Sequence, residues 1–259
     1  MLDQSSLRRR LEVATEAATY AGEIALKYFQ TDVEVERKSD DSPVTIADRT
    51  VEDLLVKSLS AAFPEDGILG EEHGEKPGTS GCRWLLDPID GTQSFVRGVP
   101  LFGVMVALVA DDEEVLLGVV HMPALRETVS AARGEGCFCN GARTRVSSVA
   151  TLAESCVLFT EFPVDESQLA AFERVRSLVR VVRGWGDCYG HMLVATGRAD
   201  VMLDPILSDW DSAPLSPIVE EAGGTFTDWS GRRTAFGKSG VSTNGHLRDE
   251  LFRSLNGLS

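Results

Sequence analysis

Four acidic segments along the chain carry the side chains best suited to chemistry. They are Thr45-Ile46-Ala47-Asp48, Gly70-Glu71-Glu72, Asp87-Pro88-Ile89-Asp90-Gly91-Thr92 and Trp210-Asp211. In the third segment Pro88 restricts the backbone between two aspartates, and Gly91 permits close approach of other groups. Carboxylates about 4 Å apart repel each other by roughly 4 kcal/mol at an effective dielectric near 20. A divalent cation would remove that repulsion. An all-oxygen donor set without nearby cysteine or histidine favours magnesium or manganese over zinc.

A metal site of this kind is suited to phosphoryl chemistry. Two ions roughly 3.5–4 Å apart can clamp a phosphoryl group, generate hydroxide and stabilise the leaving oxygen. The backbone amides of Gly91 and Thr92 could face an anion, and the Thr92 hydroxyl could orient a water. Each segment alone also has a purely structural interpretation, because Asp-Pro and Asp-Gly are common in turns and Trp210-Asp211 is typical of a helix start. All four occurring in order favour the metal site.

Composition limits the partners and the environment. The chain has 259 residues, 43% of them hydrophobic, and a net charge of -15, which disfavours nucleic acid and anionic membranes. We find no apolar run long enough to span a membrane and no apolar core of a signal peptide near the N-terminus. Five cysteines without a CxxC pair argue against a disulfide framework and a structural zinc site. We therefore expect a cytoplasmic protein.

Hydrophobic periodicity predicts the elements that must position these acids. Helices are expected over residues 3–30, 45–63, 166–178, 189–196 and 211–222. Strands are expected at residues 68–69, 84–86, 101–110, 115–121, 130–132, 144–146, 179–183 and 201–203. Glu71 and Asp87 thus follow strands, while Asp48 and Asp211 stand near helix starts. No repeat or low-complexity linker occurs, so we predict one compact domain over residues 1–259, with a soft boundary between halves 1–148 and 149–259.

The order of the motifs resembles the inositol monophosphatase family of magnesium-dependent phosphatases. The pieces are Val44-Thr45-Ile46-Ala47-Asp48, Gly70-Glu71-Glu72, Trp84-Leu85-Leu86 with the following segment to Thr92, Asn140-Gly141, residues 193–200, Trp210-Asp211 and residues 220–224. The resemblance implies a layered α/β/α/β/α sandwich of the inositol monophosphatase and fructose-1,6-bisphosphatase type, often a homodimer. It covers nearly the whole chain.

The resemblance also implies roles for individual residues. The family members bind two or three magnesium ions, and manganese is a possible substitute. In this chain the ions would be held by the side chains of Glu71, Asp87, Asp90 and Asp211 and by the Ile89 carbonyl. Gly91 and Thr92 would bind phosphate through their amides, and Asp90 and Asp211 would also face the substrate. Glu71 and Thr92 would orient the attacking water, with Asp48 supporting them, and no phosphoenzyme would form.

Substrate choice depends on residues outside this cluster. Residues 94–103 and Gly186-Asp187-Cys188-Tyr189-Gly190 resemble the histidinol-phosphate phosphatase branch, although Gln93 stands where its members commonly carry lysine. Asp187 and Asp204 fall where inositol phosphatases contact the ring, and two acids there would suit an amine and an imidazole. Each acid also has a structural alternative: Asp187 could be a helix N-cap, and Asp204 could be a turn residue before Pro205. Arg183 and Trp185 could line the same pocket, with a surface ion pair as the alternative for Arg183.

The predicted function is hydrolysis of L-histidinol phosphate to L-histidinol and phosphate in histidine biosynthesis. Inositol-1-monophosphatase or another sugar-alcohol phosphatase is the alternative, and a non-catalytic metal-binding regulatory protein with the same fold is the third. The string from Cys137 to Thr144 matches the C-x5-R-T pattern of cysteine phosphatases, but its glycines indicate a hairpin turn rather than a nucleophile. His73 and His191 are interpreted as surface or packed histidines rather than general bases.

Overall fold

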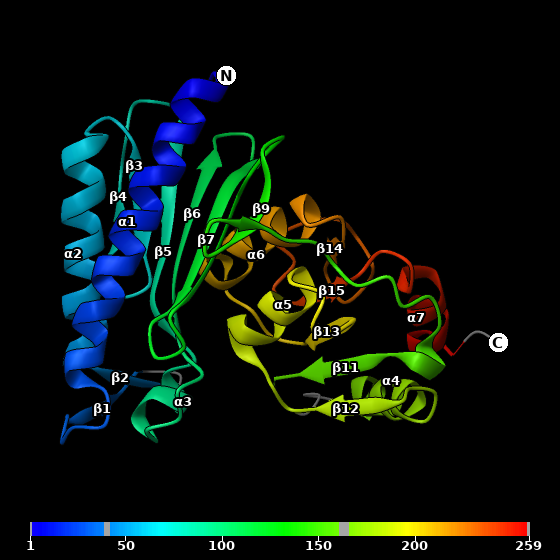
Figure 1. Cartoon of the computed structure of the whole chain (residues 1–259). Helices are drawn as coiled ribbons and strands as arrows, with labels where there is room; N and C mark the ends of the chain where they lie inside the picture. Colours follow the sequence, from blue (N-terminus) through cyan, green and yellow to red (C-terminus); the bar gives the residue numbers. More distant parts are fainter. Residues whose placement is uncertain (1, 39–41, 161–165, 258–259) are drawn as a thin grey trace.

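The computed structural model describes residues 2–38, 42–160 and 166–257, which form five layers (Figure 1). Helices α1 (Gln4–Tyr28) and α2 (Ile46–Ala62) cover one face of an eight-stranded sheet. Helices α5 (Asp187–Ala195) and α6 (Asp209–Glu221) lie between this sheet and a five-stranded one. Helices α4 (Glu166–Arg176) and α7 (Arg248–Leu255) pack together on the outer face of the smaller sheet. The predicted α/β/α/β/α sandwich is confirmed.

The eight-stranded sheet is antiparallel except at one pair of strands. Its spatial order is β10 (Ala142–Arg143), β9 (Gly136–Cys139), β8 (Glu127–Ala132), β7 (Val115–Met122), β6 (Gly103–Ala110), β5 (Cys82–Asp90), β3 (Gly67–Gly70) and β4 (Gly74–Lys76). Strands β3 and β5 run parallel, with Gly70 opposite Leu86. Their carboxyl ends therefore lie at the same edge of the sheet, where two of the acidic segments begin.

The five-stranded sheet is mixed. Its order is β12 (Val181–Arg183), β11 (Cys156–Phe159), β13 (Val201–Asp204), β15 (Gly240–Thr243) and β14 (Thr225–Thr227), with β11 parallel to both of its neighbours. A short ribbon of β1 (Val35–Arg37) and β2 (Pro43–Thr45), a short helix α3 (Thr92–Val96) and a 3-10 turn at Leu152–Glu154 complete the described elements. The ribbon and α3 lie at the same end of the large sheet (Figure 1).

Helices cover both faces of the large sheet. On α1 a stripe of buried alanines, Ala14, Ala18, Ala21 and Ala25, allows the helix to approach the sheet closely. The opposite face of that sheet contributes Met105 and Val120 to a core shared with Leu215 and Ile218 of α6. Both faces of the large sheet are thus buried.

Most predicted elements are present, with corrections at several boundaries. The first two helices lie within the predicted ranges, and α5 and α6 each begin two residues earlier than predicted. The predicted strand at residues 144–146 is wrong. Pairing ends at β10, and the Val146 amide donates instead to the Ala222 carbonyl at the end of α6. The strand predicted at 179–183 is shorter, because the Val181 amide bonds the Ser155 carbonyl where pairing with β11 starts.

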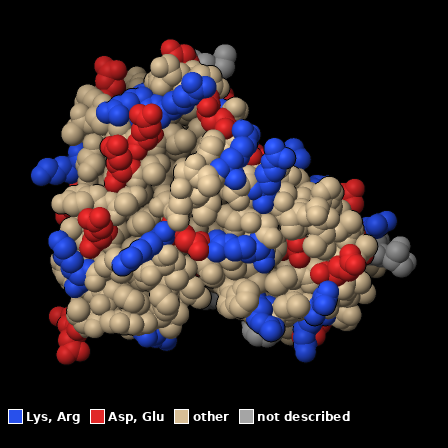
Figure 2. Space-filling model, viewed as in Figure 1, with Lys and Arg blue, Asp and Glu red and all other residues tan. Residues whose placement is uncertain are grey.

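The surface carries both signs of charge. On the face seen in Figure 2, basic and acidic side chains are interspersed, and the acidic excess does not gather into one continuous patch. None of the described helices is long and apolar enough to cross a membrane.

Candidate active site

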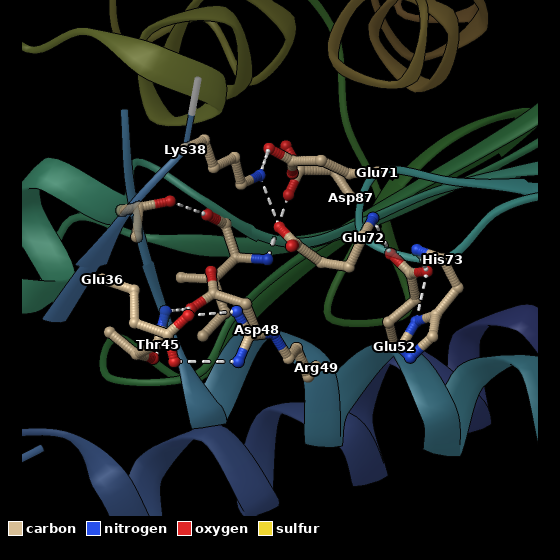
Figure 3. Close-up of polar contacts among 12 residues, drawn as sticks. Glu36, Lys38, Thr45, Asp48, Arg49, Glu52, Glu71, Glu72, His73 and Asp87 are labelled. Carbon is tan, nitrogen blue, oxygen red and sulfur yellow. Dashed lines mark hydrogen bonds and ion pairs between the residues drawn. The ribbon is translucent and has the colours of Figure 1, made fainter. Parts of the chain in front are cut away.

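Strand register brings Glu71 beside Asp87. Because β3 and β5 are parallel with Gly70 opposite Leu86, the residues that follow them leave the sheet side by side. The Glu71 amide continues the pairing by donating to the Leu86 carbonyl at 3.2 Å. Figure 3 shows the two carboxylates next to each other.

A β-bulge turns Asp90 toward the same cleft as Asp87. Asp87 pairs with Met105 and Asp90 with Gly103, so three steps along β5 match two along β6. In a regular strand, the side chains of residues three apart point to opposite faces of the sheet. The extra residue of the bulge places the side chains of Asp87 and Asp90 on the same face. Within the bulge the Ile89 amide donates to Asp87 Oδ1 at 3.0 Å.

The third carboxylate arrives from α6, far along the chain. Asp211 lies in the first turn of that helix, where its Oδ2 accepts the Ser208 amide at 2.7 Å in a capping box. Ser208 is therefore the N-cap, and Asp211 stands three residues inside. One oxygen from each of Asp87, Asp90 and Asp211 lies within 4.8 Å of the others. The structure brings all three together.

Burial and mutual repulsion disfavour the charged form of the carboxylates in this cluster. Burial, and then the charges of Glu71 and Asp211, raise the pKa of Asp87 well above its usual range. Burial and the charge of Asp187 do the same to the pKa of Asp90. Burial raises the pKa of Glu71 to about 7, although the neighbouring Lys38 lowers it. The donors are all oxygen and converge within a few ångströms, so the residues fit a hard divalent cation.

Lys38 is a site residue that the sequence analysis missed. Its ammonium lies 2.6 Å from Glu71 Oε1 and 2.5 Å from Glu72 Oε1 (Figure 3). Burial opposes its charge, but the hydrogen bonds to both glutamates raise the pKa of Lys38 above its ordinary value. Lys38 follows ribbon strand β1, and nothing in the local sequence separates it from other surface lysines.

Glu52, also missed, supports the turn that carries Glu71 and Glu72. Its carboxylate is fully buried and accepts the amides of Glu72 and His73, each at 2.8 Å. The His73 ring also bonds it, at 2.9 Å, so this histidine supports the turn. A signal did exist, because Glu52 interrupts the apolar stripe of the second predicted helix, one turn after Asp48.

Asp48 lies behind the cleft rather than in it. Its Oδ2 accepts the Thr45 amide at 2.8 Å and the Thr45 hydroxyl at 2.7 Å, which caps α2. Burial raises its pKa. Asp48 lines neither of the two cavities at the site.

Two adjoining cavities make up the cleft. One, of about 400 Å³, is lined by Lys38, Glu71, Asp87, Ile89, Ser208 and Trp210; the other, of about 440 Å³, by Arg37, Thr160, Asp187, Asp204, Ile206 and Leu207. Both include Ser42, Asp90, Gly91, Thr92 and Asp211. We call the first the carboxylate chamber and the second the alcohol chamber, after the leaving alcohol that the family resemblance leads us to expect there. Their combined size suits a small molecule.

Gly91 and Thr92 line both chambers. Gly91 has a left-handed backbone with φ 77°, and a Cβ there would lie 2.9 Å from the Leu101 carbonyl oxygen and 3.1 Å from Asp187 Oδ2. The Thr92 hydroxyl donates to the Ile89 carbonyl at 2.8 Å. Glycine is required here by both conformation and space.

Both predicted specificity acids reach the alcohol chamber. Asp187 is the first residue of α5, with φ 54°, and Gly186 rather than Asp187 is the N-cap. Asp204 ends β13 and is buried. The N-cap alternative for Asp187 is therefore not what the structure contains.

Three other candidates lie elsewhere. Arg183 sits exposed on β12, where its guanidinium donates to the Val182 carbonyl, and neither Arg183 nor Trp185 lines the chambers. The structure does not bring Arg183 to the site, because the edge strand β12 turns it toward solvent. Cys137 lies in strand β9, and burial raises the pKa of its thiol to about 12, unlike a nucleophilic cysteine.

Comparisons with known proteins agree with this geometry. The model of the inositol monophosphatase family matches residues 6–257. The histidinol-phosphatase of Chlorobaculum parvum is 47% identical over 249 residues, covering 95% of this chain and 96% of that protein. The fructose-1,6-bisphosphatase/inositol-1-monophosphatase of Thermotoga maritima is 36% identical over 250 residues, covering 95% and 96%. The crystal structure of the extragenic suppressor protein suhB from Bartonella henselae superposes with a TM-score of 0.89 at 33% identity, covering 94% of this chain and 97% of that one. The resemblance predicted from the motifs is confirmed, and the chain belongs to the inositol monophosphatase family of phosphomonoester hydrolases.

Proposed function

We propose that the protein is a magnesium-dependent phosphatase that hydrolyses L-histidinol phosphate to L-histidinol and phosphate, a step of histidine biosynthesis. One observation carries the proposal: a cluster of carboxylates opens into a second chamber that holds two further acids, Asp187 and Asp204. The similarity to a protein named histidinol-phosphatase supports the same substrate.

In this proposal the carboxylate chamber holds the phosphate. The side chains of Glu71, Asp87, Asp90 and Asp211 and the Ile89 carbonyl would hold two or three magnesium ions, with manganese as a substitute. When bound, the ions would supply Lewis acidity and a water of lowered pKa. Glu71 and the Thr92 hydroxyl would orient that water, and the amides of Gly91 and Thr92 would bind phosphate oxygens. Asp48 would act only indirectly, through the start of α2.

The alcohol chamber would select the leaving group by charge. Of its described lining residues, Asp90, Asp187, Asp204 and Asp211 are acidic and Arg37 is basic. Histidinol carries an ammonium group and an imidazole, which such acids can bind through charge-assisted hydrogen bonds. A neutral polyol can donate hydrogen bonds to these acids but offers them no opposite charge.

The experiment is a substrate comparison on the purified protein with magnesium. Histidinol phosphate, inositol 1-phosphate and fructose 1,6-bisphosphate are assayed at equal concentrations. We expect kcat/KM for histidinol phosphate to exceed the others by about 100-fold, since a site built for polar groups discriminates strongly. A preference for inositol 1-phosphate would overturn the substrate assignment but not the phosphatase chemistry. Chelation should abolish activity and added magnesium restore it; activity that survives chelation would contradict the metal mechanism.

An inositol or sugar phosphatase is the second candidate. The relative from Thermotoga maritima, named for both inositol-1-phosphate and fructose bisphosphate hydrolysis, supports it. A non-catalytic regulatory protein is the third, and it is disfavoured because Glu71, Asp87, Asp90, Thr92 and Asp211 are all present.

We also propose that the protein is a cytoplasmic homodimer with no nucleic-acid or membrane partner. The family resemblance and the acidic composition support this. Light scattering coupled to size-exclusion chromatography measures the oligomeric state directly, and a monomer at micromolar concentration would contradict the dimer.

A further inference from the structure

The two acids of the alcohol chamber are joined by a single side chain, Thr160. Its hydroxyl donates to Asp204 Oδ2 at 2.6 Å and accepts the backbone N–H of Asp187 at 2.9 Å. Thr160 itself lines the chamber. One hydroxyl therefore uses its donor and an acceptor position to connect the residue at the end of β13 with the residue at the start of α5.

The sheet explains how Thr160 reaches Asp204. Strands β11 and β13 are parallel, with Phe159 opposite Leu203, so Thr160 and Asp204 follow as neighbours at the carboxyl edge. The ring nitrogen Nε2 of buried His191 lies 3.9 Å from Asp204 Oδ2, too far for a hydrogen bond. Among the described contacts, the Thr160 hydroxyl is thus the group that fixes the orientation of the Asp204 carboxylate.

The start of α5 is also built around Thr160. A Cβ on Gly186 would lie 2.5 Å from Thr160 Cα and 2.8 Å from its Oγ1, so only glycine lets the two backbones pack. Asp187 then adopts a left-handed backbone with φ 54°, a conformation that is uncommon for residues other than glycine but that aspartate adopts more readily than most. On the other side the Cys188 amide donates to Asp90 Oδ2 at 2.7 Å. The first turn of α5 is thus tied both to the carboxylate chamber and, through Thr160, to Asp204.

We propose that Thr160 is a positioning residue for substrate specificity: it orients the Asp204 carboxylate and fixes the backbone of Asp187, so that the carboxylates of both residues bind cationic groups of the leaving alcohol. The inference rests on the proposed function, because it assumes a cationic alcohol. Thr160 acts through the two aspartates, so its loss affects substrates that use the alcohol chamber more than substrates that use only the carboxylate chamber.

The test compares Thr160→Val and Thr160→Ser on histidinol phosphate and on para-nitrophenyl phosphate, which has no cationic group. Valine keeps the branched shape but removes the hydroxyl, so the Asp187 N–H loses its acceptor and the Asp204 carboxylate loses its donor. We expect T160V to lower kcat/KM for histidinol phosphate by about 10-fold or more, with most of the change in KM, and to change the aryl phosphate by less than about 3-fold. T160S keeps the hydroxyl, so the ratio of kcat/KM for histidinol phosphate to kcat/KM for the aryl phosphate should stay close to that of the wild type.

A matched control is Thr225→Val. Thr225 is a buried threonine whose hydroxyl bonds that of Thr243 at 2.8 Å, in edge strand β14 away from both chambers. T225V should lower thermal stability without changing the ratio of the two substrates. If T160V fails to fold, Thr160→Ala gives a second route, because it removes the same hydroxyl with a smaller side chain and should change the ratio of the two substrates in the same direction.

The outcomes separate this inference from the proposed function. An equal loss on both substrates, or no change on either, overturns the role of Thr160. If the wild-type protein prefers an inositol phosphate, the substrate proposal fails. In that case kcat/KM for the inositol phosphate is divided by kcat/KM for the aryl phosphate, in T160V and in the wild type. A ratio that differs between the two proteins supports a positioning role of Thr160 for a different alcohol. An unaltered ratio overturns that role.

Discussion

At the residue scale, the site depends on a few positions where only one residue type fits. Gly91 is one of these, because its backbone is left-handed and its missing Cβ leaves room for the Leu101 carbonyl and the Asp187 carboxylate. Asp87 and Asp90 depend on local geometry in another way, because the β-bulge between them places both carboxylates in the same cleft. Small local features therefore determine whether the carboxylates converge.

Replacement of Gly91 tests this point. Gly91→Ala should lose about 1–2 kcal/mol of stability from the left-handed backbone, with a further loss from contact with the rigid Leu101 carbonyl. We expect activity to fall more than 10-fold, in line with the sensitivity of catalysis to misplacement of roughly 1 Å. Urea unfolding and kcat/KM measure the two effects.

Gly141→Ala is the matched control for that variant. Gly141 has φ 78°, nearly the same backbone strain, but nothing lies within 4 Å of its Cβ position. It should therefore lose stability alone. Full activity in G91A, or equal loss of activity in both variants, would contradict the role of space at Gly91.

At the scale of elements, α2 supports the site from below. It presents Asp48 and Glu52 one turn apart on its inward face, the first capping the helix and the second holding the Glu71–Glu72 turn (Figure 3). A Cβ on Gly70 would lie 2.2 Å from Glu52 Oε1, so the strand end, the turn and the helix fit as one unit.

Glu52→Gln should loosen this unit. An amide nitrogen would replace one of the acceptor oxygens that now receive backbone N–H groups, at a loss of about 1–3 kcal/mol of stability. Magnesium affinity should also fall several-fold, because Glu71 loses its support. Thermal unfolding with chelator and calorimetric titration with magnesium measure the two effects. Asp53→Asn, on the exposed face of the same helix, should stay within about 0.5 kcal/mol and bind magnesium normally; an E52Q protein indistinguishable from D53N would refute the prediction.

The contact of α1 with β7 predicts a pH effect on stability. His121 packs so closely under α1 that a Cβ on Gly22 would lie 2.5 Å from its ring, and burial lowers the pKa of His121 to about 4 from its ordinary value of 6.5. Between those values the unfolded chain binds a proton that the folded one excludes. The stability contributed by the neutral ring is complete above pH 6.5 and is lost as pH falls toward 4, by at most about 3 kcal/mol.

Comparison with His121→Asn isolates this effect, because the other titrating groups are the same in both proteins. Thermal unfolding from pH 7 to 4, in the presence of chelator, should show the wild type losing stability faster than H121N. Parallel curves would mean that His121 titrates normally in the folded protein.

At the scale of the whole molecule, the site belongs to both halves of the chain. Glu71, Asp87 and Asp90 come from the large sheet, whereas Asp187, Asp204 and Asp211 come from α5, β13 and α6. Helix α6 also covers an apolar face of the large sheet through Leu215 and Ile218. This packing supports the prediction of one domain with only a soft boundary.

Expression of the halves tests that prediction. A fragment of residues 1–148 would expose the apolar face that α6 covers, so we expect it to be insoluble or to lack a cooperative unfolding transition. Co-expression with residues 149–259 should restore soluble, active protein. A fragment that alone unfolds cooperatively would show two independent domains.

Much of the site could be predicted from the sequence because its chemistry lies in short, ordered segments. Strand ends and helix starts are local properties, so Glu71, Asp87, Asp90 and Asp211 could be named, and the five layers followed from the family resemblance. The failures have one physical cause. The strand predicted at 144–146 is instead bound to the end of α6, and Arg183 faces solvent on an edge strand, both decided by neighbours distant in sequence.

Only the tertiary structure decided how the acids are held and what accompanies them. Lys38 between Glu71 and Glu72, Glu52 beneath their turn, and Thr160 between Asp187 and Asp204 are contacts across 20 to 44 residues. No local pattern of hydrophobicity or turn chemistry encodes such pairs, since they depend on which strand ends lie side by side. The sequence determined that a carboxylate cluster exists; sheet register and the packing of α5 and α6 determined its shape and the acids of the adjoining chamber.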